Sequence, residues 1–135
     1  MEHSIEIRVQ YFETDGQGRV HHSQYLNYLE RGRVEFLRSL GHSYRDLEAR
    51  GLMLVVSRLE IQYLGAACFD DLLRLTTKVA RTRGVRIDHE YELVRLSDAS
   101  KSEESIVKAA TTIACIDREG KVSRLPEYLR KPISA

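Results

Sequence analysis

The chain begins with a short stretch in which apolar and polar residues alternate. Over residues 4–11, Ile5, Ile7 and Val9 share one face and are separated by charged or polar residues. A period of two is typical of a strand that is buried on one face only. Similar apolar or alternating runs predict four more strands, at residues 52–64, 71–82, 85–95 and 105–116. The later strands are bounded by polar or glycine-containing turns at residues 65–70, 97–104 and 117–120.

Between the first and second predicted strands, the apolar period lengthens to that of a helix. Residues 23–40 carry apolar side chains on a single stripe, which is made of Tyr25, Leu29, Gly32, Phe36 and Leu40. We expect Ser23 to cap the start of this helix and Gly41 to end it. Because glycine costs a helix about 1 kcal/mol relative to alanine, Gly32 indicates the close approach of another backbone. A second, short helix is expected over residues 43–50.

The remaining face of the long helix is charged and is expected to lie in solvent. Its acid–base pairs are three or four residues apart, at Glu30–Arg33, Arg31–Glu35 and Glu35–Arg38. One strand, one long helix and at least four strands that can pair antiparallel indicate an α+β fold. We expect a single domain over residues 1–135, with the helix on one face of the sheet and a partner subunit covering the other.

Composition narrows the possible classes of function. The 135 residues carry 21 basic and 20 acidic side chains, a net charge of +1, which argues against binding nucleic acid through a broad positive field. No apolar run reaches the ~18 residues that a membrane helix needs, and the chain does not begin like a signal peptide, so we expect a cytoplasmic protein. Cys68 and Cys115 lie in apolar runs and are expected to be buried thiols rather than a disulfide.

Candidate chemistry is concentrated in the segment that leads into the long helix. Residues 11–25 contain Asp15, two glycines and two histidines. A helix start presents unpaired N–H groups and partial positive charge, so an acid beside it suits a reaction that needs a base and a stabilised oxyanion. No metal site is expected, because adjacent histidines such as His21 and His22 seldom converge on one ion. By itself, Asp15–Gly16 is also typical of an ordinary turn.

Two linked motifs resemble those of the hotdog-fold thioesterases, in particular the 4-hydroxybenzoyl-CoA thioesterases and the small acyl-CoA thioesterases encoded beside Tol–Pal genes. They are Tyr11-x-x-Thr-Asp15-x-x-Gly18-x-Val-x-His22-x-x-Tyr25 and Tyr28-x-Glu30-x-Gly-Arg33-x-Glu35. Less specific matches follow downstream, at Ile61-Gln-Tyr63, Asp70-Asp71-Leu-Leu and Leu125-Pro126-Glu-Tyr-Leu129. The resemblance extends over nearly the whole chain and implies a hotdog fold, in which an antiparallel sheet wraps around one long central helix.

The resemblance also implies roles for individual residues. Asp15 falls on the family's catalytic aspartate, which would act either as a general base on water or as a nucleophile. His22 falls on the residue that opens the helix, whose backbone N–H is implied to hold the thioester oxygen. Tyr11 falls on a tyrosine that lines the same pocket. The acyl group is not specified, because the chain departs from the family's pattern at Glu13, Gly16, Gln17 and Arg19.

Arg81, Arg83 and Arg86 stand where the family often has basic residues near the CoA phosphates. A guanidinium group suits this role because its forked geometry matches phosphate oxygens. The implied substrate is an acyl-CoA or acyl-carrier-protein thioester, with no cofactor besides the CoA that is part of the substrate. The resemblance further implies a homodimer or homotetramer with active sites shared between subunits. A non-catalytic acyl-binding protein and a dehydratase of the same fold are the alternatives.

Overall fold

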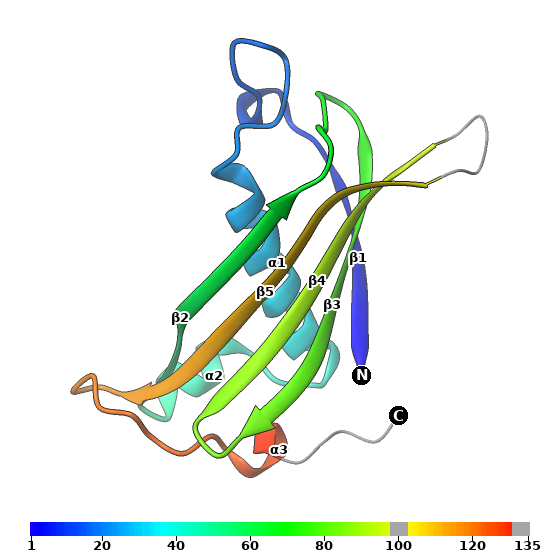
Figure 1. The fold of residues 1–135 in the computed structure, drawn as a ribbon. Helices are drawn as coiled ribbons and strands as arrows, with labels where there is room; N and C mark the ends of the chain where they lie inside the picture. Colours follow the sequence, from blue (N-terminus) through cyan, green and yellow to red (C-terminus); the bar gives the residue numbers. More distant parts are fainter. Residues whose placement is uncertain (98–102, 131–135) are drawn as a thin grey trace.

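The computed structural model describes residues 1–97 and 103–130, which form one antiparallel sheet and four helical segments (Figure 1). The five strands lie in the order β1-β3-β4-β5-β2. Their bounds are Glu2–Arg8 for β1, Leu52–Tyr63 for β2, Leu72–Arg83 for β3, Arg86–Leu96 for β4 and Glu103–Asp117 for β5. The α+β class expected from the sequence is confirmed.

The helical segments comprise one long helix and three short ones. Helix α1 (Gln24–Ser39) packs on one face of the sheet and contacts β1 and β3. The short segments are the 3-10 turn η1 (Tyr11–Glu13), α2 (Tyr44–Ala49) and α3 (Glu127–Arg130). None of the described helices is both long and apolar enough to cross a membrane.

Most predicted elements match the structure, with two differences at strand ends. The first strand ends at Arg8 instead of continuing to Tyr11, because the chain turns into η1. The N–H of Gln10 donates to the Glu13 carboxylate at 2.7 Å and holds this turn. The predicted turn at 97–104 falls largely on residues 98–102, which lie outside the described residues, and Glu103 already belongs to β5.

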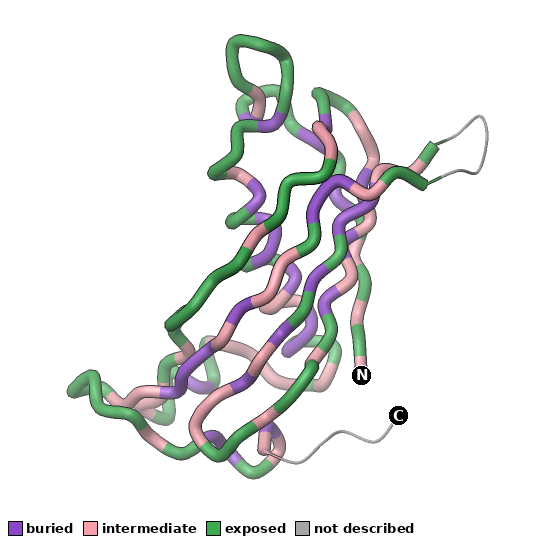
Figure 2. Tube along the Cα trace, viewed as in Figure 1, coloured by how far each residue is buried: buried purple, intermediate pink, exposed green. Residues whose placement is uncertain are grey.

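The alternation along the strands separates an apolar face from a charged one. Along β4, Ile87, His89, Tyr91 and Leu93 are buried (Figure 2). The opposite face carries exposed charged side chains, including Lys78, Glu90, Glu92 and Lys108. An antiparallel sheet can present one polar face to water, so the single chain does not require a cover here, and a partner on this face stays a prediction.

Gly32 is required by side chains of the sheet and not, as expected, by another backbone. A Cβ atom at this position would lie 2.5 Å from Thr77 Oγ1 and 2.7 Å from Leu75 Cδ2. Both residues belong to β3 and are fully buried. The missing side chain therefore lets α1 lie directly on β3.

The predicted charged face of α1 is only partly solvated. Arg38 pairs with Glu35 in solvent as expected. Arg33 does not, because it is half-buried and donates a hydrogen bond to the Tyr91 hydroxyl at 3.2 Å. The sequence spacing placed Arg33 beside Glu30 but gave no sign of the cavity that α1 and the sheet enclose around it.

Of the two residues predicted to cap α1, one takes the expected role in the structure and the other does not. Gly41 adopts a φ of +85° just after the helix, as a terminating glycine should. Ser23 makes no capping bond, because its hydroxyl and N–H both contact Nδ1 of His21.

Cys115 is a buried free thiol as expected, whereas Cys68 is exposed, contrary to the prediction from its apolar run.

Candidate active site

A small hairpin precedes α1 and carries Asp15. Thr14 pairs with Val20, and Arg19 pairs with Cys68 of the segment before β3. The N–H of Asp15 donates to the carbonyl of Arg19 at 2.7 Å. These backbone contacts hold the hairpin beyond the end of the sheet, next to the start of α1 (Figure 1).

The Asp15 carboxylate is exposed and ionised in the single chain. Its Oδ1 accepts the N–H groups of Gln17 at 2.8 Å and Arg19 at 3.3 Å. The bond from Gln17 contributes most to lowering the pKa of Asp15, and the nearby His21 ring adds a smaller electrostatic effect. Desolvation acts in the opposite direction, but the hydrogen bonds outweigh it and the pKa of Asp15 is lowered. The charged carboxylate is available as a base or as a nucleophile.

Glu13 anchors the hairpin to the long helix, a role that the sequence did not reveal. Its carboxylate is buried and accepts the Tyr28 hydroxyl at 2.9 Å as well as the Gln10 N–H. Its carbonyl accepts the N–H of His21 at 2.9 Å. A buried acid with hydrogen-bond partners is tolerated, and here it ties η1 to the second turn of α1. In the sequence, the anchoring role of Glu13 is indicated only by the presence of an acidic residue in a segment that otherwise looks like a turn.

His22 lies at the start of α1 and offers a free backbone donor. Over residues 1–97 and 103–130, its N–H donates to no protein acceptor. Its carbonyl accepts the Tyr63 hydroxyl from the end of β2 at 3.1 Å. The ring stacks on that of His21, with 4.3 Å between centroids. These contacts hold the His22 backbone in place and leave its N–H without a protein acceptor.

Tyr11 is exposed within the single chain. Its ring packs edge to face on Phe69, with 5.4 Å between centroids. Phe12 beside it is equally exposed, at 76% of its surface. These three aromatic rings form an apolar surface next to the Asp15 hairpin, and in one chain nothing covers it among the described residues.

The three predicted CoA-binding arginines lie far from Asp15 within one chain. They flank the turn between β3 and β4, at the end of the sheet opposite the Asp15 hairpin (Figure 1). Arg81 is exposed, and Arg83 donates two hydrogen bonds to Asp88, at 2.9 and 3.1 Å. Arg86 is half-buried. A single chain therefore does not bring the arginines and the carboxylate together.

Sequence comparison identifies the family to which the chain belongs. A family model described as the Thioesterase-like superfamily matches residues 9–133. The chain belongs to this family. Over 115 residues it is 38% identical to the acyl-CoA thioesterase YbgC of Haemophilus influenzae, covering 84% of this chain and 80% of that protein. The enzyme class expected from the motifs is confirmed, because the chain is a thioester hydrolase by this relationship.

Solved structures of this family share the fold. A probable thioesterase from Bartonella henselae is 37% identical, with a TM-score of 0.83 over 93% of this chain and 100% of that chain. A 4-hydroxybenzoyl-CoA thioesterase is only 14% identical, yet its TM-score is 0.87, with 95% of each chain covered. The latter shows the fold alone. The sheet wrapped around α1 is therefore the hotdog fold that the motifs implied.

Proposed function

We propose that this protein is an acyl-CoA thioesterase, which hydrolyses a thioester to a free acid and CoA. The observation that carries the proposal is an ionised Asp15 carboxylate on the hairpin that leads into α1, combined with an unpaired His22 N–H at the start of that helix. One group supplies a negatively charged oxygen and the other a donor at the positive end of a helix. These are the two requirements of attack on a thioester carbonyl.

In the proposed reaction, the carbonyl oxygen of the thioester accepts the His22 N–H. Asp15 either takes a proton from a water molecule that attacks the carbonyl carbon, or attacks that carbon itself to form a mixed anhydride that water then cleaves. The C–S bond breaks in either route and the thiolate leaves. Because thiols have a pKa near ~8.5, the thiolate departs with little need of a general acid. No cofactor or metal is needed.

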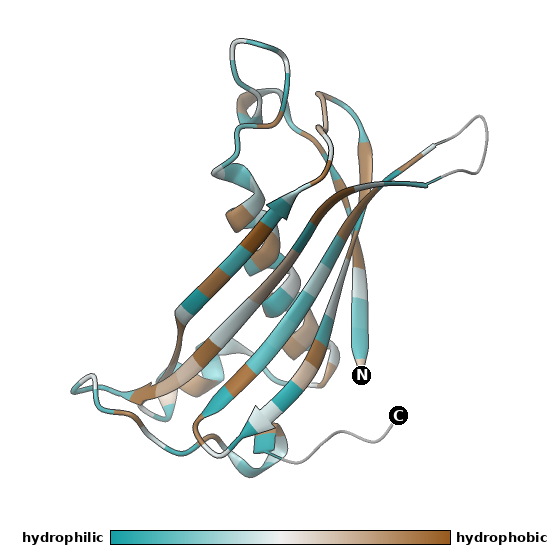
Figure 3. Ribbon diagram, viewed as in Figure 1, coloured by the Kyte–Doolittle hydropathy of each residue, from teal (hydrophilic) through white to brown (hydrophobic). Residues whose placement is uncertain are grey.

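We further propose that the enzyme is a homodimer joined through β2. This edge strand is 12 residues long and exposes Val55, Val56 and Leu59 (Figure 3). A long, apolar and unpaired edge is a site for pairing with another chain. Two-fold pairing of two β2 strands is antiparallel, so the Asp15 end of one subunit lies on the same side as the β3–β4 turn of its partner.

This dimer gives the three arginines a role. Arg81, Arg83 and Arg86 of one subunit would bind the CoA phosphates of a substrate whose thioester lies at Asp15 of the other. Tyr11 and its aromatic neighbours would line the acyl pocket once a partner covers them. Nothing in the described residues selects the acyl group. We also propose a cytoplasmic location, where CoA thioesters are made and used.

The decisive experiment replaces Asp15 with asparagine. The amide oxygen of Asp15→Asn can still accept the N–H groups of Gln17 and Arg19, so the hairpin should keep its fold while the base and nucleophile are lost. We expect kcat for thiol release to fall by about 10²–10⁴-fold. The matched control, Asp70→Asn, changes an exposed aspartate with a φ of +71°, where asparagine is well tolerated, and should leave kcat unchanged. Normal turnover by Asp15→Asn would refute the proposal.

Two further arms of this assay address the alternatives. Thiol release is measured over short, long and aromatic acyl-CoA thioesters, and one acyl group is compared on CoA and on acyl carrier protein. Faster turnover of the carrier-protein form would identify a carrier-protein thioesterase. Tight binding with no thiol release across the panel would identify a non-catalytic acyl-binding protein.

A further inference from the structure

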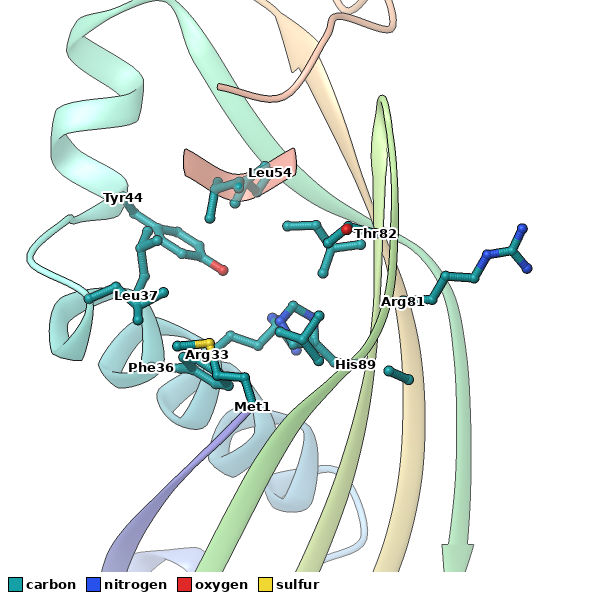
Figure 4. Close-up of a pocket in the computed structure, with 14 residues that line it drawn as sticks. Met1, Arg33, Phe36, Leu37, Tyr44, Leu54, Arg81, Thr82 and His89 are labelled. Carbon is teal, nitrogen blue, oxygen red and sulfur yellow. The ribbon is translucent and has the colours of Figure 1, made fainter. Parts of the chain in front are cut away.

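A small cavity lies between the second half of α1, α2 and the sheet (Figure 4). Its volume is about 150 Å³, equal to that of an engineered apolar cavity known to bind benzene. Its walls are largely apolar and are formed by Phe36, Leu37, Leu54, Val79, Ile87 and Leu129. The cavity is distinct from the candidate active site, because Arg33 at its centre follows the start of α1 by nine residues, ~14 Å along the helix axis.

A guanidinium group faces this cavity. Arg33 reaches in from α1 toward the middle of the space (Figure 4). Its guanidinium donates to the Tyr91 hydroxyl and also interacts with the Tyr44 hydroxyl. In the described part of the chain, no carboxylate lies within salt-bridge distance of its guanidinium. A half-buried guanidinium without a carboxylate partner has fork-shaped donors available to an anion.

Two further polar groups converge on the same space. His89 is only 8% exposed, and its Nδ1 is buried with no hydrogen-bond partner. Burial and the charge of Arg33 lower the pKa of His89 to about 4, so the ring is neutral at neutral pH and carries one N–H. The hydroxyl of Tyr44 also points into the cavity (Figure 4). Because buried polar groups are normally satisfied, the unpaired Nδ1 of His89 in this cavity indicates a missing partner.

We propose that the cavity is a second binding site, which takes a small monocarboxylate whose apolar body is about the size of a benzene ring. The carboxylate would accept hydrogen bonds from Arg33, with Tyr44 and His89 as additional donors. The ring would contact the apolar walls. A cation does not fit, because Arg33 repels it and no acid lines the cavity. An inorganic anion would leave the apolar walls without a partner.

Binding of benzoate to the full chain at neutral pH tests this site. Benzamide has the same shape without the charge, and inorganic phosphate has charge without the ring. We expect benzoate to bind by calorimetry and by NMR shifts of Arg33 and its neighbours, with a Kd of about 1 mM, as expected for so small a ligand. Benzamide and phosphate should bind at least about tenfold more weakly. No binding of benzoate, or equal binding of benzamide, would overturn the proposal.

Variants locate the bound benzoate. Arg33→Met should weaken binding at least about tenfold, and the Tyr91 hydroxyl keeps its partner, Thr111 Oγ1 at 2.6 Å. Tyr44→Phe removes one hydroxyl with less risk to folding and should weaken binding severalfold. The control Arg31→Met removes an exposed arginine of the same helix and should bind as the wild type.

Asp15→Asn separates this proposal from the proposed catalytic function, because the variant should lose turnover and keep its affinity for benzoate. Wild-type affinity in both Arg33→Met and Tyr44→Phe would overturn the second site. So would weakened binding in Asp15→Asn alone, because benzoate would then lie in the candidate active site.

Discussion

His22 and His89 differ in their surroundings and therefore in the chemistry open to them. His22 is exposed at the start of α1, and the role proposed for it belongs to its backbone N–H. His89 is buried on the apolar face of β4, and its Nδ1 has no hydrogen-bond partner. The period-two alternation of residues 85–95 is enough to place position 89 on the apolar face of its strand. That the Nδ1 of His89 lacks a partner and lies at a cavity beside Arg33 depends on the packing of other elements against β4.

The depressed pKa of His89 predicts a loss of stability in acid. In the unfolded chain a histidine titrates near ~6.5, and in the fold burial and Arg33 lower the pKa of His89 to about 4. As the pH falls from 6.5 toward 4, His89 binds a proton in the unfolded state but stays neutral in the folded state. The free energy of unfolding therefore decreases. Between pH 7 and 4.5 this one group should remove about 2 kcal/mol.

Denaturant unfolding of the wild type and of His89→Gln at the two pH values measures this contribution. Carboxylates affect both proteins equally, so the difference between their pH dependences isolates His89. His22→Gln, which changes an exposed ring, should retain the wild-type pH dependence. An identical loss of stability in His89→Gln would show that His89 does not titrate as described.

The two edge strands of the sheet differ in their capacity for pairing. β1 has 7 residues and presents Glu2, Glu6 and Arg8, and short or charged edges resist association. β2 has 12 residues and exposes several apolar side chains. Alternation alone did not reveal that β2 is an edge, because its neighbour β5 lies more than 40 residues later in the chain.

A lysine on β2 should therefore dissociate the proposed dimer. Val56 is 48% exposed, so Val56→Lys should change the stability of the folded chain by no more than about 0.5 kcal/mol. Sedimentation velocity should show a dimer for the wild type and a monomer for the variant. Glu2→Lys on the β1 edge is the matched control and should remain dimeric. A dimeric Val56→Lys would place the interface elsewhere.

At the scale of the whole molecule, the candidate catalytic and CoA-binding residues occupy opposite ends of one sheet. Twelve residues of β3 separate the Asp15 end from the arginine turn, a length of ~40 Å. A catalytic site that uses both must draw them from two subunits. In the proposed dimer, the activity is therefore a property of the assembly.

Subunit complementation tests this sharing. One chain carries Asp15→Asn, and the other carries Arg81→Ala, Arg83→Ala and Arg86→Ala together. In a mixed dimer with shared sites, one of the two sites has both the native carboxylate and the native arginines. Since half of randomly assembled dimers are mixed, co-expression should restore about a quarter of the wild-type kcat/KM. Activity no greater than the mean of the two parent variants would show that each chain uses its own residues.

By itself, the sequence determined the kinds of element, their order and the motif that precedes α1. These follow from periodicity and local backbone preference, which act over a few residues, as the turn at Gly41 illustrates. Only the tertiary structure decided that Cys68 is exposed, that Arg33 faces a cavity and that Asp15 lies far from Arg83. Burial and proximity depend on which distant segments pack together, and no local pattern carries that information.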